Sequence, residues 1–169
     1  MTITIADVFK NGLWLTLPPL LLSLGLMFFL PTALTADQFN QGIPQLLLIG
    51  ETIMRVVVFA MPAFFLIDLS TPLQKTGLVV YLVGVALYYL SYLTQNFLPE
   101  SAWSTSLIGF ASTAYTNVVW MIGLGLLGKK FYFPQGLRYR PAFYVVPAIV
   151  FICLHVTHTV MYYQRTHGK

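Results

Sequence analysis

The chain has 169 residues, of which 57% are hydrophobic and only 8% carry a formal charge. A soluble domain has about 25% charged residues, and a mean hydropathy of +0.76 leaves too few polar side chains to cover a water-facing surface. This composition excludes an ordinary soluble enzyme, a disordered tail and a nucleic-acid-binding domain. The net charge of +4 does not indicate nucleic acid, because an excess of lysine and arginine also sets membrane topology. The sequence therefore predicts an integral membrane protein.

Apolar segments of about 20 residues, the length that crosses a bilayer as a helix, follow one another along the chain. Proline, glycine and serine lie between them and favour turns. We therefore expect an all-α fold, with residues 1–169 forming a single domain, an integral membrane bundle of five transmembrane helices. The predicted spans cover residues 13–30, 44–67, 78–98, 106–128 and 141–163.

The first span could also be a cleavable signal peptide. Its apolar core is long, and the sequence Thr-Ala-Leu-Thr-Ala at 32–36 is a poor cleavage site. We expect this span to be a retained membrane anchor.

The short connections differ in their basic residues. The N-terminus and the connections 68–77 and 129–140 together carry six lysines and arginines, whereas the remaining connections and the C-terminal tail carry two. The positive-inside rule places the N-terminus in the cytoplasm and the C-terminus outside, in what we expect to be a prokaryotic cytoplasmic membrane. In the connection 129–140, basic and aromatic residues alternate, which suits anionic lipid headgroups.

Two full charges, Glu51 and Arg55, lie inside the second span. Four residues apart, they share a helical face and can form an ion pair. Each costs about 2.5–3.5 kcal/mol at mid-membrane, so an intramembrane ion pair predicts a functional site. The alternative is a structural clamp that orients this helix against its neighbours.

Polar residues of the other spans fall at the same depth as this pair. At about 1.5 Å per residue from the outer end of each span, Glu51 lies about 10 Å deep and Arg55 about 16 Å. The inner halves of the last four spans are almost wholly apolar, whereas a continuous pore would need polar lining throughout. The pattern predicts a cavity that opens to one face of the membrane. The other polar residues of this layer lie between about 8 and 17 Å below the outer ends of their spans: Ser23, Tyr88, Tyr92, Thr113, Thr116, Asn117, His155 and His158.

Two further motifs are weaker. His155 and His158 share a helical face and, with Glu51, could hold a metal, although hydrogen-bonded packing or a proton-accepting role is favoured. Gly123, Gly125 and Gly128 spell G-x-G-x-x-G, but no strand precedes them, so helix packing explains them better than a nucleotide. The sequence identifies no cofactor. The single cysteine, Cys153, excludes an internal disulfide and is expected to be a small buried hydrophobe.

The favoured function is binding of a small or amphiphilic ligand in the outer half, for uptake, sensing or assembly. In one alternative, the protein is a membrane-embedded enzyme that acts on a lipid, with Glu51 and His155 as the acid–base pair. In the other, it is a structural subunit whose polar layer only joins helices. An odd number of spans argues against a repeated transporter and favours a homo-oligomer or a subunit of a membrane complex. The expected ligand-binding residues are Glu51, Arg55, Tyr88, Tyr92, Thr116, Asn117, Trp120, His155 and His158.

Overall fold

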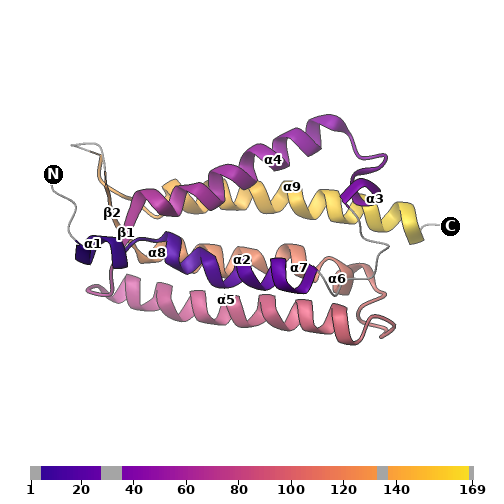
Figure 1. Ribbon diagram of the computed structural model, residues 1–169, viewed down its shortest axis with the longest axis horizontal. Coiled ribbons are helices and arrows are strands. Elements are labelled where there is room, and N and C mark those ends of the chain that lie inside the picture. Colours follow the sequence, from indigo (N-terminus) through magenta and orange to yellow (C-terminus); the bar gives the residue numbers. More distant parts are fainter. Residues whose placement is uncertain (1–4, 28–35, 133–136, 168–169) are drawn as a thin grey trace.

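The computed structural model describes residues 5–27, 36–132 and 137–167 and has the form of an elongated helical bundle with its termini at opposite ends (Figure 1). This confirms the predominantly α-helical fold. The helices are α1 (Ile5–Phe9), α2 (Leu13–Met27), α3 (Ala36–Asn40), α4 (Gln45–Ala60), α5 (Pro72–Phe97), α6 (Leu107–Phe110), α7 (Ser112–Tyr115), α8 (Asn117–Leu127) and α9 (Ala142–His167).

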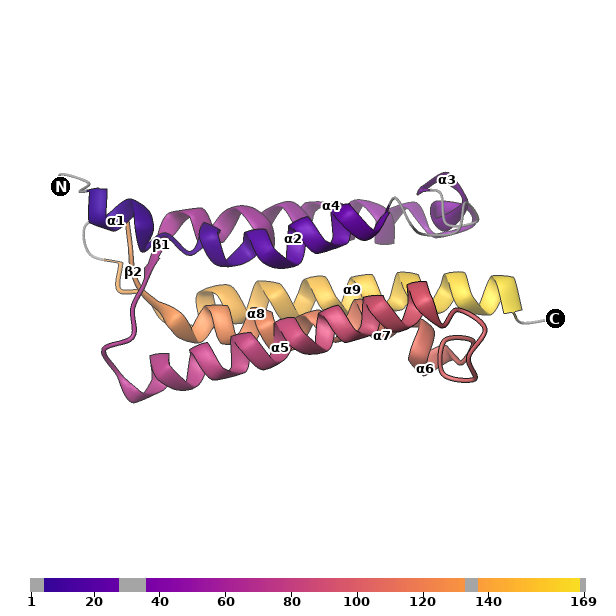
Figure 2. The same ribbon diagram turned by 60° about the horizontal axis from the view of Figure 1, so that its bottom comes forward.

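The two ends of the bundle differ. One end, which we call the strand end, holds α1 and a two-stranded antiparallel sheet of β1 (Phe65–Ile67) and β2 (Gly128–Phe131). The other, which we call the cavity end, holds α3, α6 and the end of α9 (Figure 2). The connections predicted to lie on one side of the membrane therefore gather at one end of the molecule.

The sheet departs from the all-α expectation, since residues 65–67 were predicted to continue the second helix. Pro62 has no N–H to donate to the carbonyl one turn earlier, which weakens the α-helix at this point. The chain instead forms one turn of 3₁₀-helix, η2 (Met61–Phe64), and then extends as β1. The sheet is tied to the N-terminal segment, because Gly12 N donates to Phe65 O and Ile67 N to Lys10 O.

Three helical stretches are long and apolar enough to cross a membrane, namely Gln45–Phe64, Pro72–Phe97 and Ala142–His167. The other two predicted spans form shorter helices. Residues 28–30 of the first lie outside the described residues. The fourth is divided into α6, α7 and α8 at Ala111 and Thr116. Hydroxyls compete for backbone carbonyls here, as Ser112 Oγ donates to Gly109 O and Thr116 Oγ1 donates to Ser112 O.

Helix α5 packs most extensively on α8, and glycine makes this contact possible. A Cβ atom at Gly84 would collide with the backbone of Trp120, and one at Gly123 would collide with the backbone of Tyr81. The two backbones therefore touch without an intervening side chain, as in membrane helices that pack through small residues. Gly125 is likewise covered by Val145 of α9, and Gly128, the first residue of β2, is covered by Tyr139 of the connection before α9. Close packing therefore accounts for all three glycines of the G-x-G-x-x-G match.

Helix α2 contains Pro18 and Pro19, and α5 compensates for one of them. Pro19 cannot donate to the carbonyl of Leu15, four residues earlier. The hydroxyl of Tyr81 donates to that carbonyl instead, over 2.7 Å. The proline and the tyrosine thus form one structural unit across two helices.

The outward faces of the long helices are apolar. On α5, for example, Val79, Leu82 and Leu90 each expose more than half of their surface. Cys153 also lies on an exposed face, of α9, which corrects the expectation that it is buried. These faces suit a hydrocarbon environment.

Candidate functional site

Glu51 is the centre of a buried polar cluster between α4 and α9. Its side chain is only 3% exposed, although it carries a carboxylate. Arg55, one turn along α4 and half-exposed, donates to Oε1. His155 Nδ1 lies 3.0 Å from Oε1 and His158 Nδ1 lies 2.6 Å from Oε2. Both carboxylate oxygens are therefore occupied, by three partners from two helices.

His158 continues the cluster towards α3. Its ring is almost completely buried, and Nε2 lies 3.1 Å from the carbonyl oxygen of Phe39. The ring of Phe39 packs against His158 with 4.2 Å between the centroids. Both nitrogens of His158 are thus used, and α3 closes the buried side of the cluster.

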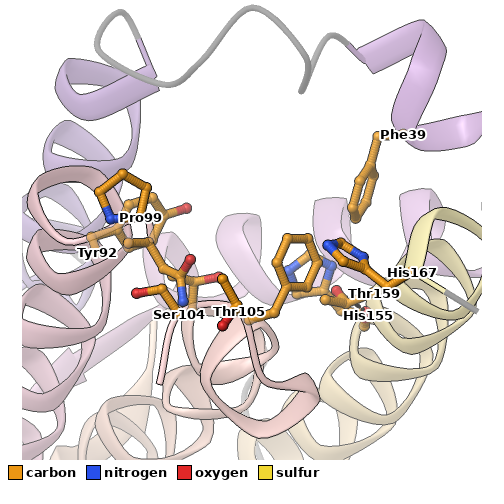
Figure 3. A pocket seen from close by; sticks show the side chains of 11 residues that line it. Phe39, Tyr92, Pro99, Ser104, Thr105, His155, Thr159 and His167 are labelled. Carbon is orange, nitrogen blue, oxygen red and sulfur yellow. Dashed lines mark hydrogen bonds between the residues drawn. The ribbon is translucent and has the colours of Figure 1, made fainter. Parts of the chain in front are cut away.

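His155 differs from His158 because it reaches a cavity. The cavity has a volume of about 370 Å³ and lies at the cavity end of the bundle. Figure 3 shows Tyr92, Pro99 and Ser104 on one side of it, with Phe39, His155, Thr159 and His167 on the other. The ring of His155 stacks on Phe151, and its Nδ1 is held by Glu51. Its Nε2 makes no hydrogen bond within the described part of the chain and is available to a molecule in the cavity.

The structure separates the predicted ligand-binding residues into three groups. Glu51, Arg55, His155 and His158 form the cluster. Tyr92 and His155 line the cavity, and Tyr88 packs edge-on against Tyr92 with 4.9 Å between the ring centroids. The third group, of Thr116, Asn117 and Trp120, lies at the α5–α8 contact.

Members of this third group are bound to one another and to their own helical segment. Trp120 Nε1 donates to Asn117 Oδ1 over 2.8 Å, and the Asn117 amide donates to Thr113 O over 2.7 Å. Thr116 Oγ1 also accepts, at 3.5 Å, from Ser91 of α5. These contacts suit helix packing, as in the alternative of a structural subunit whose polar layer only joins helices.

Several cavity residues were not predicted. Phe39 lies in the short helix α3, which apolar periodicity does not detect. Phe110 lies in α6, inside the fourth predicted span, but its side chain is apolar and so was not part of the predicted polar layer. Thr159 lies one turn beyond His155 and shares its face, so the spacing could have identified it. His167, expected to be a solvated tail residue, stacks on Tyr163 at the cavity rim. The remaining lining residues missed are Gln95, Pro99, Ser104 and Thr105.

The two histidines are not arranged around a common ion. Both direct Nδ1 at Glu51, and no group of three or more His, Cys, Asp or Glu side chains in residues 5–27, 36–132 and 137–167 is placed to hold a metal. What the cluster can do chemically is hold and exchange protons.

The basic connection 129–140 lies at the strand end, with residues 133–136 outside the described part. Lys129 forms an ion pair with Asp68. Hydrogen bonds from Lys129 and Ser70 lower the pKa of Asp68 to about 2. Lys130, Arg138 and Arg140 are exposed there. A second hollow of about 420 Å³, more open and largely apolar, also lies at this end and is lined by residues that include Val8, Trp14 and Tyr132.

Comparison with known proteins gives no further guide to the site. No protein-family model, curated protein sequence or solved structure matches this chain. The function must therefore be argued from the site itself.

Proposed function

We propose that this chain is an integral membrane protein of five spans that binds a small or amphiphilic molecule in the cavity beside His155. A mostly apolar cavity with a few convergent polar groups is typical of a ligand site, and about 370 Å³ lies within the usual range of about 300–1,000 Å³.

Two further spans would be formed by α2 and by the segment from α6 to α8, which run beside the longer helices (Figures 1 and 2). The segment 107–127 is about 31 Å long at 1.5 Å per residue, enough for the hydrocarbon core. The six basic residues that predict topology belong to connections at the strand end. Their excess favours a cytoplasmic strand end, so the cavity would open to the outside, and the exposed lysine and arginine side chains would meet anionic lipid headgroups.

The observation that carries this proposal is the position of Glu51. A buried carboxylate in an apolar bundle costs several kcal/mol unless partners offset that cost. A packing contact needs no such group, whereas a binding site does. His155 links the carboxylate to the cavity wall, so the charge can act on a ligand through one imidazole.

Thermal unfolding of the purified protein with a panel of single-chain amphiphiles tests the proposal. We expect at least one to raise the unfolding midpoint, and Glu51→Gln and Arg55→Met each to reduce that increase. Thr52→Val changes an exposed neighbour that bonds only to its own helix, and it should leave the increase intact. An increase that is equal in all four proteins would contradict the proposed site, and a structural subunit would then be the better description.

One observation also favours the enzymatic alternative. A carboxylate that binds one imidazole nitrogen and leaves the other facing a cavity is the usual arrangement of a general base. On this alternative, His155 removes a proton from a lipid substrate and Glu51 orients the ring. Turnover of a membrane phospholipid by the purified protein, lost in His155→Gln, would support catalysis, and absence of turnover would leave binding as the function.

A further inference from the structure

The hydrogen bonds of His158 fix how many protons the cluster holds. The carbonyl of Phe39 can only accept, so Nε2 of His158 must carry a proton. The 2.6 Å contact between Nδ1 and Glu51 Oε2 needs one more proton, on either atom, because two lone pairs would repel. Glu51 and His158 together are therefore neutral, whichever of them carries the shared proton.

The state of His155 follows in the same way. The Arg55 guanidinium donates to Glu51 Oε1 and favours its unprotonated form, so we assign His155 Nδ1 as the second donor to this oxygen. A neutral His155 then has its lone pair on Nε2, the nitrogen available to the cavity. With Arg55 positively charged, the whole cluster carries a net charge of +1.

Like the cluster, the cavity wall has basic groups that can accept or carry a positive charge. Its described lining residues include two imidazoles, of His155 and His167, and no carboxylate. Phe39, Pro99 and Phe110 make much of the remaining wall apolar. A wall of this kind suits a molecule with an apolar chain and one acidic group.

We infer that the cavity binds a single-chain amphiphilic carboxylic acid as its anion, with His155 protonated at Nε2. This inference rests on the proposed binding function. When the neutral acid enters, its O–H bond breaks and the proton forms an N–H bond at Nε2, which leaves a carboxylate beside an imidazolium. When the anion enters from water, the same proton comes from the solvent. Glu51 stabilises the imidazolium through Nδ1.

The titratable and polar groups that surround His155 come from four helices. On α4 they are Glu51 and Arg55, and on α9 they are His158 and, at the rim, His167. Helix α5 contributes Tyr92, and α3 contributes the carbonyl of Phe39 through His158.

Calorimetry of the full chain in phosphatidylcholine nanodiscs tests the inference, with empty discs subtracted. Decanoic acid, decanol and decyltrimethylammonium are titrated at about pH 7.5 in two buffers of different ionisation enthalpy, where histidine is mostly neutral. We expect decanoic acid to bind tightest, with uptake of close to one proton per molecule bound. His155→Gln should bind it at least about tenfold more weakly, without proton uptake. Thr157→Val, on the exposed face of α9, should match the parent protein.

The possible results separate the two proposals. Equal binding of decanol or of the ammonium compound would overturn the acid inference while leaving ligand binding in place. Binding of decanoic acid by the parent protein without proton uptake, or unchanged uptake in His155→Gln, would overturn the role of His155. Failure of all three compounds to bind would overturn both this inference and the proposed function.

Discussion

The α5–α8 and α4–α9 contacts join helices by opposite means. At α5–α8, Gly84 and Gly123 let the backbones touch, and the polar side chains nearby are bound within the contact. At α4–α9, three basic side chains converge on the carboxylate of Glu51. The first contact is sufficient for stability without any charge. The second therefore indicates a requirement other than stability, since buried ion pairs are weak stabilisers compared with apolar packing.

The largest expected effect comes from filling the glycine contact. In Gly84→Leu the new side chain has no space against the backbone of Trp120, so α5 and α8 must separate. We expect the free energy of unfolding in detergent to fall by more than about 3 kcal/mol, the upper range for overpacking. Gly25→Leu is the matched control, because no heavy atom lies within 4 Å of the added Cβ. Equal losses in the two variants would show that α5–α8 is not the tighter contact.

The sequence predicted the helical fold because apolar segment length is a strong signal. It did not predict β1, because its residues Phe65–Ile67 are as apolar as the helix before them and only Pro62 separates the two. It also missed α3, which lies in a predicted connection and is too short to show periodicity. The interruption of the fourth span at Thr116 comes from hydroxyl–carbonyl bonds that the residue pattern does not specify.

The candidate site was predicted in part, by the rarity of charge. Glu51, Arg55 and the two histidines stood out because charged and imidazole groups are costly in hydrocarbon, and depth counting placed them at one level. Depth alone could not separate a cavity wall from a helix contact. Asn117 and Trp120 lie at the right depth to form a wall, but they do not line the cavity: they are bonded to each other, and the Trp120 ring packs near Phe59 of α4. Side-chain direction is set by helix rotation in the folded bundle.

A smaller effect is expected from breaking the polar contact at its buried side. His158→Phe keeps the ring size, but it leaves Glu51 Oε2 and the Phe39 carbonyl without their partner. We expect unfolding measurements to show a loss of about 2–3 kcal/mol. In Glu51→Gln/His158→Phe the carboxylate is absent as well, so the total loss should be less than the sum of the two single losses. Strictly additive losses would mean that the two residues do not interact.

The smallest effect should come from the more exposed ion pair at the strand end, Asp68–Lys129, whose carboxylate side chain is 18% exposed whereas that of Glu51 is 3% exposed. Asp68→Asn should lower the unfolding midpoint at neutral pH by only about one or two degrees, as expected for surface pairs.

The folded pKa of Asp68 is about 2, below its ordinary value of 3.8. The contribution of Asp68 to stability is therefore complete above its ordinary pKa and is lost as the pH falls through its pKa in the folded protein. The difference in unfolding midpoint between the parent and Asp68→Asn should therefore shrink as the pH falls from 3.8 to about 2. Glu100→Gln, which removes a negative charge at the cavity end, is the control. A pH-independent difference would mean that the charge of Asp68 does not carry its contribution, because the variant keeps the backbone bond to Leu127. A loss as large as that of His158→Phe would contradict the distinction between exposed and buried pairs.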